Sequence, residues 1–438
     1  MKNHKHQNFF PKSPLLLLPF LITACFNPEP DDYGLVLEAV DVVCVEATFR
    51  VTASGVPETW TCGLYRDDSL VVTETLSGQS GYIRDTGLLP AADYTYHITY
   101  MKEGRDKDRS DPIAVTTPDT TSHDFTWTVE TLGDAGSYFN DVAIVDENNI
   151  WVVGNINTPD GEYNAARWNG SEWEFMGIYS NTLDLYSIWY FAEDDIWVLS
   201  SYPIHWDGES WTHYHLTEMG IIPGGLGGSI WGASPNDVWF VGRYGRIVHY
   251  DGSRFRRVES GTDVDFTDIY GVNANHIWVA GCDEFTQSVI IGIFDSKPTK
   301  LFHRYSDGTN NLDDETYWSP EAWTIWTGPH SRRLKIAGGY GLYELDNRES
   351  PQKYTRIDVE AHTGYFAYPW KMRGNHEADL FIAGEFGSLF HFNGLSWHWY
   401  EGLVSESVRL KSIAVINRSV VAVGVDHGSF LSKVVMGK

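Results

Sequence analysis

Residues 229–242 read SIWGASPNDVWFVG, and this phrase recurs through the last three hundred residues of the chain. Each clear copy has a polar residue, an apolar run, a turn with Asp or Asn, and a second apolar run ending at Gly or Ser. The other clear copies are residues 141–154, 187–200 and 268–281, and in all four the first and last residues stand 13 apart. Weaker copies lie at 324–338, 371–384 and 412–424, so the closing positions recur every 39 to 57 residues.

A repeat of this length, built from short alternating strands, predicts a β-propeller with one blade per copy. Each repeat contains four apolar runs, and four repeats place Asn-Gly or Asp-Gly before the last run, which favours a tight turn. Those turns are Asn169-Gly170, Asp207-Gly208, Asp251-Gly252 and Asn393-Gly394. The last repeat ends after three runs, while residues 125–132 form an isolated run. We expect these two ends to pair and close a seven-bladed ring, which would leave no open sheet edge.

The first residues resemble a bacterial lipoprotein signal peptide. Lysines precede the apolar run of residues 15–22, and the sequence Ile22-Thr23-Ala24-Cys25 follows. The resemblance implies removal of residues 1–24 and lipidation of Cys25, whereas an ordinary secretory signal with a chance cysteine is the alternative. The apolar run is too short for a retained transmembrane helix. Residues 25–33 then form an acidic tether, and the expected location is the bacterial cell envelope, anchored by lipid, at the outer membrane, or secreted.

The charge of the chain argues against several partners. The formal net charge is −27 and 42% of the residues are hydrophobic. Such a chain can bury a large core, but it repels polyanions, and it has no stripe of Lys and Arg. We therefore expect no nucleic-acid partner, and membrane contact through the lipid anchor only.

Residues 34–117 predict a separate all-β domain. Residues 88–94 (LLPAADY) resemble the tyrosine-containing corner of fibronectin type III domains, which implies a two-sheet sandwich. Cys44 and Cys62 fall on what read as neighbouring strands, and outside the cytoplasm they could form a disulfide; two buried free thiols are the alternative. Residues 118–124 then read as a linker that lets the propeller (residues 125–438) swing on its stalk.

One face of the propeller is the predicted binding surface, because the connections on that face are long. Five connections stand out: residues 155–164, 217–228, 282–288, 306–320 and 360–369. Long loops of this kind often carry function. They contain aromatic residues beside acids, a combination that suits either a protein interface or a glycan. The residues predicted to bind are Tyr163, Asp283, Tyr317, Trp318, Tyr365, Tyr368 and Trp370; packing at blade ends is the alternative for them.

Signals for catalysis are weak, and we assign no catalytic residue, metal or cofactor. Asp194-Asp195 and Asp313-Asp314 are paired acids, but a pair of sequence neighbours does not establish the spacing that glycosidases need. His213 and His215 could form half of a metal site, but no third ligand accompanies them, which favours an exposed histidine pair. Gly224 to Gly228 precede a strand and not a helix, which argues against a phosphate-binding loop.

The phrase at residues 230–242 also resembles a repeat of uncharacterised bacterial envelope lipoproteins. This resemblance covers residues 125–438 and implies a propeller and an envelope location, but no activity. We therefore expect an all-β protein in which a fibronectin type III-like sandwich presents a seven-bladed propeller. Its expected role is binding, to an envelope protein or a glycan. A carbohydrate-active enzyme and a scaffold for outer-membrane assembly remain the alternatives.

Overall fold

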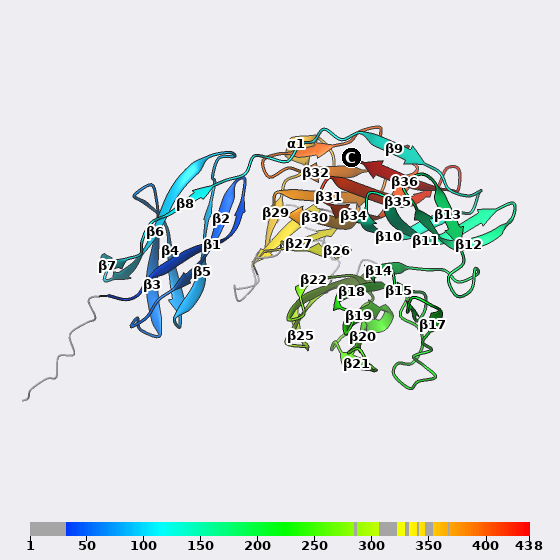
Figure 1. Ribbon diagram of the computed structural model, residues 1–438, viewed down its shortest axis with the longest axis horizontal. Coiled ribbons are helices and arrows are strands. Elements are labelled where there is room, and N and C mark those ends of the chain that lie inside the picture. The colour runs from blue at the N-terminus through cyan, green and yellow to red at the C-terminus, as the bar shows by residue number, and fades with distance from the viewer. Residues whose placement is uncertain are drawn as a thin grey trace, which may run out of the picture.

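The computed structural model describes residues 32–283, 287–305, 322–328, 333–339, 341–346, 354–366 and 368–438. The lipidation call at Cys25 and the binding calls at Tyr317 and Trp318 lie outside these residues. The regular secondary structure of the described part is almost entirely β-strand (Figure 1).

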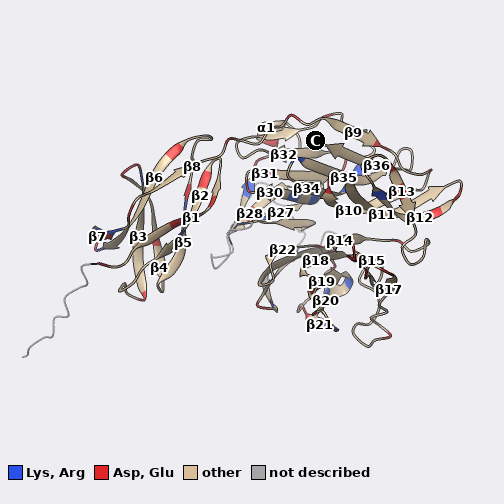
Figure 2. Cartoon of the chain, viewed as in Figure 1, with Lys and Arg blue, Asp and Glu red and all other residues tan. Residues whose placement is uncertain are grey.

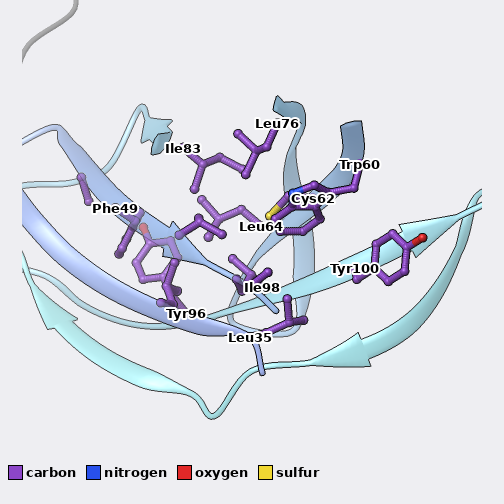
Figure 3. Close-up of a cluster of buried hydrophobic side chains, with 14 of the residues drawn as sticks. Leu35, Phe49, Trp60, Cys62, Leu64, Leu76, Ile83, Tyr96, Ile98 and Tyr100 are labelled. Carbon is purple, nitrogen blue, oxygen red and sulfur yellow. The ribbon is translucent and has the colours of Figure 1, made fainter. Parts of the chain in front are cut away.

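The first eight strands form two sheets that share one core. One sheet has the order β1-β2-β5: Val36–Val43, Glu46–Thr52 and Ser80–Thr86. The other has the order β4-β3-β6-β7, with β8 also pairing with β6: Ser69–Ser77, Thr59–Arg66, Asp93–Lys102, Arg105–Arg109 and Ile113–Thr116. Phe49, Leu64 and Tyr96 are fully buried between the sheets (Figure 3). The Tyr94 hydroxyl accepts a hydrogen bond from the Leu89 backbone N–H at 2.8 Å. Membership of the fibronectin type III family stays a prediction.

The predicted disulfide is wrong, because Cys44 and Cys62 are both free. Cys62 lies on β3 inside the sandwich core (Figure 3). Cys44 lies in the turn between β1 and β2, and its Sγ contacts the backbone oxygen of Asn393 in the propeller at 3.7 Å. Cys44 faces a different domain from Cys62. Burial raises the pKa of Cys62 to about 12 and raises that of Cys44 above its ordinary value.

The remaining strands form seven four-stranded antiparallel sheets, the blades of a β-propeller. The first three blades are β10–β13, β14–β17 and β18–β21. Their bounds are Tyr138–Asp146, Asn149–Thr158, Gly161–Trp168 and Trp173–Met176; Ser187–Ala192, Asp195–Leu199, Pro203–Trp206 and Trp211–His213; and Ser229–Ser234, Asp237–Gly242, Arg246–Tyr250 and Phe255–Glu259. A short 3₁₀ turn, η1 (Arg243–Gly245), joins β19 to β20.

Blades four to seven complete the ring. Their strands are β22–β25 (Phe266–Asn273, His276–Asp283, Gln287–Phe294, Lys297–Tyr305), β26–β29 (Thr324–Trp326, Arg333–Gly338, Gly341–Asp346, Tyr354–Ile357), β30–β33 (Pro369–His376, Asp379–Gly384, Leu389–Phe392, Trp397–Trp399) and β34–β36 with β9 (Val408–Ile416, Ser419–Asp426, Leu431–Gly437, Trp127–Glu130). Helix α1 (Glu360–Thr363) lies in the connection between the fifth and sixth blades.

The predicted closure of the ring is confirmed. Strand β9 pairs with β36, with Val129 opposite Val435, so the first strand of the propeller completes the last blade. The innermost strands contact one another in sequence around the ring, and β10 of the first blade contacts β34 of the seventh. The polar residue that opens each repeat helps to join the blades. For example, the Asp141 carboxylate accepts hydrogen bonds from Ser187 in the second blade and from Ser412 in the seventh.

Asn and Asp shape the third-to-fourth strand turns through their side chains. The glycines adopt positive φ, for example +90° at Gly208. Asp207, which precedes Gly208, instead accepts hydrogen bonds from the backbone N–H groups of Glu209 and Ser210 through Oδ1. Asn169, Asp251 and Asn393 accept equivalent bonds in their own turns. The turns lie where they were predicted. They are not tight two-residue turns, because the side-chain oxygen of Asn or Asp closes a four-residue loop.

An Asp–His–aromatic unit recurs inside the blades. Trp197, Trp239 and Phe381 lie on the second strands and stack on His205, His249 and His391 of the third strands, with ring centroids 4.0 to 4.1 Å apart. Each histidine Nε2 contacts the aspartate that opens the second strand, at 2.6 to 2.9 Å. Each Asp–His pair joins the second strand of its blade to the third strand, so the unit has a structural role within the blade. Asp195, considered above as a candidate acid, belongs to this structural unit.

The sandwich and the linker both dock on the sixth blade. Val43, Cys44 and Ala378 form a small buried cluster. In the linker, the Nδ1 atoms of His123 and His391 are 2.9 Å apart, and the Thr121 hydroxyl donates to the backbone oxygen of Ala378 at 3.4 Å. The expectation of a freely swinging linker is therefore wrong, since apolar contacts and hydrogen bonds hold this segment against the propeller.

Candidate functional site

The two faces of the propeller carry different connections. The turns between first and second strands, and between third and fourth strands, form the short-turn face. The turns between second and third strands, and the connections between blades, form the opposite face, here called the long-loop face. Cys44 and the linker contact Ala378, Asn393 and Ser396, which all lie in turns of the short-turn face. The long-loop face therefore points away from this docking contact.

Exposed apolar side chains gather on the long-loop face. Four aromatic residues there have a backbone φ in the left-handed region: Tyr179 (59°), Tyr244 (58°), Phe386 (55°) and Phe430 (57°). Between 48% and 65% of each residue is exposed. Tyr368 and Met219, also exposed, lie in connections of the same face. A bulky residue in this conformation is strained, and strain combined with exposure indicates a functional surface.

A pocket of about 390 Å³ opens among these residues at the sixth blade. Its lining consists of Trp323, Tyr368, Pro369, Trp370, Glu385, Phe386 and Arg409. Trp370 packs against Trp323 with ring centroids 4.8 Å apart, and its Nε1 donates to Glu385 Oε1 at 2.9 Å. The Arg409 guanidinium lies 4.8 Å from the Trp370 ring centroid and pairs with Glu385. The walls of the pocket are therefore aromatic, with a carboxylate–guanidinium pair at one side.

The structure brings together only some of the predicted binding residues. Tyr368 and Trp370 line the pocket. Tyr365 packs on Trp399, at 4.6 Å between ring centroids, and Tyr163 packs on Phe175 at 5.8 Å. Tyr365 therefore packs on the sixth blade and Tyr163 on the first, and neither lines the pocket. Asp283 accepts two hydrogen bonds from Gln287, so it caps the turn between β23 and β24.

One of the predicted long loops is a hairpin. Strands β11 and β12 extend to Thr158 and Gly161, so residues 155–164 are mostly strand around a short turn. The connection at 217–228 has no strand, and the one at 360–369 contains α1.

Tyr244 and Phe386 were not predicted, because only long connections were considered. Both lie in brief turns between second and third strands, on the long-loop face. A sequence signal was present, since Tyr244-Gly245 and Phe386-Gly387 occupy the same turn in two blades. A third aromatic-glycine step, Tyr340-Gly341, occurs in the fifth repeat, but Tyr340 lies outside the described residues.

A second cavity, of about 290 Å³, lies on the propeller axis. Lys371 and Arg373 on β30 line it, and both bind the fully buried Asp268 carboxylate, with shortest N–O distances of 2.6 and 2.8 Å. Asp268 also accepts a hydrogen bond from Thr324, so this cluster ties together the fourth, fifth and sixth blades. The two cations lower the pKa of Asp268, against the opposing effect of burial.

Among the described residues, no group of three or more His, Cys, Asp or Glu side chains could hold a metal ion. His213 and His215 are neighbours, with ring centroids 4.3 Å apart, and burial lowers the pKa of His213. No helix in the described part of the chain has the length and apolarity needed to span a membrane.

Comparison with known proteins shows the fold. No family model and no curated protein matches the sequence. Solved structures that are similar include YCF48 from Cyanidioschyzon merolae, at 12% identity and a TM-score of 0.50, covering 70% of this chain and 98% of that one. A chain of a structure titled "Crystal Structure of Mitotic Checkpoint Complex" also matches at 12% identity and a TM-score of 0.50, covering 74% of this chain and 98% of that one. At this identity the similarity supports the propeller fold and not a shared activity.

Proposed function

We propose that this chain is a binding protein of the bacterial cell envelope, anchored by lipid at Cys25, whose long-loop face recognises a protein partner. The observation that carries the proposal is the set of exposed aromatic residues on that face. Four of them hold a strained backbone conformation, which folding alone does not favour. Aromatic side chains of this kind are typical anchors at protein interfaces.

Binding fits this face better than catalysis. Glu385, the carboxylate of the pocket, is already bound by Trp370 and Arg409, and Asp283 caps its own turn. The exposed aromatics also belong to different blades: Tyr244 to the third, Phe386 to the sixth and Phe430 to the seventh. A surface that extends over several blades suits a protein more than a single sugar ring, so a glycan ligand is the alternative outcome of the test.

The orientation of the domains supports the same role. The sandwich precedes the propeller and docks on its short-turn face. A lipid at Cys25 would tether the molecule from the sandwich side, and the long-loop face would remain accessible to a partner. The anchor itself is tested by metabolic labelling with a palmitate analogue. Wild type should incorporate the label and Cys25→Ser should not; labelling of both, or of neither, contradicts the anchor.

The binding proposal is tested by affinity capture from envelope extract. The bait is residues 26–438, which include every described element. The face variant carries Tyr244→Ser and Phe386→Ser. A matched control carries Leu395→Ser, in a turn of the short-turn face, and Ile416→Ser, at the end of β34 on the same face; both changes remove exposed apolar side chains. We expect a protein that wild type and control retain and that the face variant loses. Equal capture by all three baits would exclude this face.

A further inference from the structure

Acidic residues lie near the exposed aromatics of the long-loop face. The following inference rests on the proposed function and specifies the chemistry of the partner. The described connections of the face, together with the strand residue Glu162 beside one turn, hold many more acids than bases. Arg243 is exposed, and it is the one Lys or Arg in the described residues of these connections. The exposed acids (Asp and Glu are red in Figure 2) are Asp134, Asp160, Glu162, Glu218, Asp263, Asp265, Asp358, Glu360, Glu401 and Glu406.

Hydrogen bonds place an aromatic residue and an acidic connection together in three separate blades. In the third blade, the Tyr244 backbone N–H donates to Asp265 Oδ1 at 2.7 Å. In the seventh, the Phe430 backbone oxygen accepts from the N–H of Gly136, two residues after Asp134, at 2.7 Å.

In the sixth blade, the N–H of Gly387, next to Phe386, donates to the backbone oxygen of Val408 at 2.7 Å. Val408 directly follows the connection that carries Glu401 and Glu406.

The same arrangement therefore occurs three times: an exposed ring at positive φ, in the turn between second and third strands, beside the acidic connection that leaves the same blade. The Tyr244 ring already carries a cation of this chain, because the Arg246 guanidinium lies 4.8 Å from its centroid. Over Phe386 and Phe430 no Lys or Arg of the described residues is found.

The acids at these three places are not neutralised within the described part of the protein. Asp134, Asp263, Glu401 and Glu406 are exposed and make no ion pair with any described residue. An aromatic face attracts a cation through its quadrupole, and a nearby carboxylate adds Coulomb attraction. An acidic partner would be repelled, because like charges brought together at an interface are costly.

We infer that the long-loop face binds a basic segment of a partner protein, with Lys or Arg side chains of the partner resting on Phe386 and Phe430 beside their acids. Each ring and its neighbouring acids form one cation subsite, here called an aromatic–acid subsite. The two subsites lie on neighbouring blades, the sixth and the seventh, so they require at least two cations that are separated in the partner. Binding should be fast at low salt and should weaken as ionic strength rises.

Selection of peptides from a random phage-displayed library tests this inference. Wild-type residues 26–438 serve as the target, and the triple variant Tyr244→Ser, Phe386→Ser, Phe430→Ser serves for counter-selection. A second variant, Asp134→Asn, Glu406→Gln, keeps the rings and removes charge. Peptides specific for wild type should carry a net positive charge. Loss of each subsite should weaken their affinity roughly two- to fivefold, as expected for exposed cation–π contacts.

The outcomes separate the inference from the proposed function. Peptides that depend on the rings, are rich in Lys or Arg, and bind the charge variant more weakly support the aromatic–acid subsites. Peptides that depend on the rings but are neutral or acidic overturn the inference and leave the binding face in place. If no selected peptide distinguishes wild type from the triple ring variant, both the subsites and the face are wrong. Equal melting temperatures of the three proteins exclude misfolding as the cause.

Discussion

Strain at single exposed residues is the most direct sign of function in this chain. Phe430 has a φ of +57° and is 62% exposed. A non-glycine residue with a φ in this region lowers the free energy of unfolding by about 1–2 kcal/mol. The exposed ring of Phe430 gains little from burial that could offset this cost. Glycine relieves that cost, although its greater freedom in the unfolded state offsets about 0.5–1 kcal/mol of the gain.

We therefore predict that Phe430→Gly raises the free energy of unfolding by up to about 1 kcal/mol. Urea denaturation followed by tryptophan fluorescence measures the change, and Phe430→Ala serves as the control that keeps the strain. A clear loss of stability in the glycine variant would show that the ring supports folding and would weaken its assignment to binding.

His123 links the linker to the sixth blade and should make stability depend on pH. Burial, followed by the nearby His391 and His398, lowers the pKa of His123 to about 4. In the unfolded chain a histidine titrates near 6.5, so between these values the unfolded state binds more protons than the folded state. Stability should therefore fall as pH drops from about 6.5 to about 4.

The variant His123→Gln should flatten this part of the stability profile, measured as melting temperature at a series of pH values. The exposed His427→Gln is the matched control and should keep the wild-type slope. A wild-type slope in His123→Gln would mean that other groups cause the acid sensitivity.

At the scale of elements, the closing strand β9 holds the ring together. Its residues pair with β36 from Val434 to Gly437, far along the sequence from β9. Thr126 and Lys438 exchange both backbone hydrogen bonds, so in this antiparallel ladder Thr128, opposite Met436, also directs its N–H at β36. Proline at Thr128 would remove that donor, while the exposed side chain at this position contributes little packing.

We predict that Thr128→Pro opens the seventh blade, with faster amide hydrogen exchange in β36 than in wild type, whereas Thr128→Val preserves protection. Exchange in blades three and four should change least, because they lie far around the ring. Unchanged protection of β36 in the proline variant would show that the ring closes without this pairing.

The elements were largely predictable from sequence because each blade repeats the same pattern. The Asp-containing turn and the apolar runs fixed the strands of blades two and three, and the unpaired run at residues 125–132 predicted closure. The disulfide could not be predicted correctly, since alternation does not show which sheet or which domain a cysteine faces. The site was only partly predictable. Tyr368 and Trp370 were predicted from the length of their loop. Phe386 and Tyr244 were not, because they lie in brief turns of the long-loop face, where the backbone angles decide whether the side chain is exposed.

At the scale of the whole molecule, the sandwich and propeller form a docked pair. Ala378 is 2% exposed and packs with Val43 and Cys44 of the sandwich. A long charged side chain at this position would have to displace Val43 and Cys44 or lose hydration on burial, and both are unfavourable.

Ala378→Glu should therefore separate the two domains and raise the radius of gyration in small-angle X-ray scattering. The propeller should keep its near-ultraviolet circular dichroism, because its blades do not depend on the sandwich. Ile416→Glu, an exposed change on the same face, serves as the control. An unchanged radius would indicate that the linker alone fixes the arrangement.

Site-specific photocrosslinking in living cells is the most direct test of the long-loop face as the binding surface. A photoreactive phenylalanine analogue is placed at Phe386 on that face, or at Leu395 in a short-turn connection; both native residues are exposed. The account predicts a crosslinked protein adduct from position 386 and none from position 395. Adducts from 395 alone, or none from either position, would contradict it.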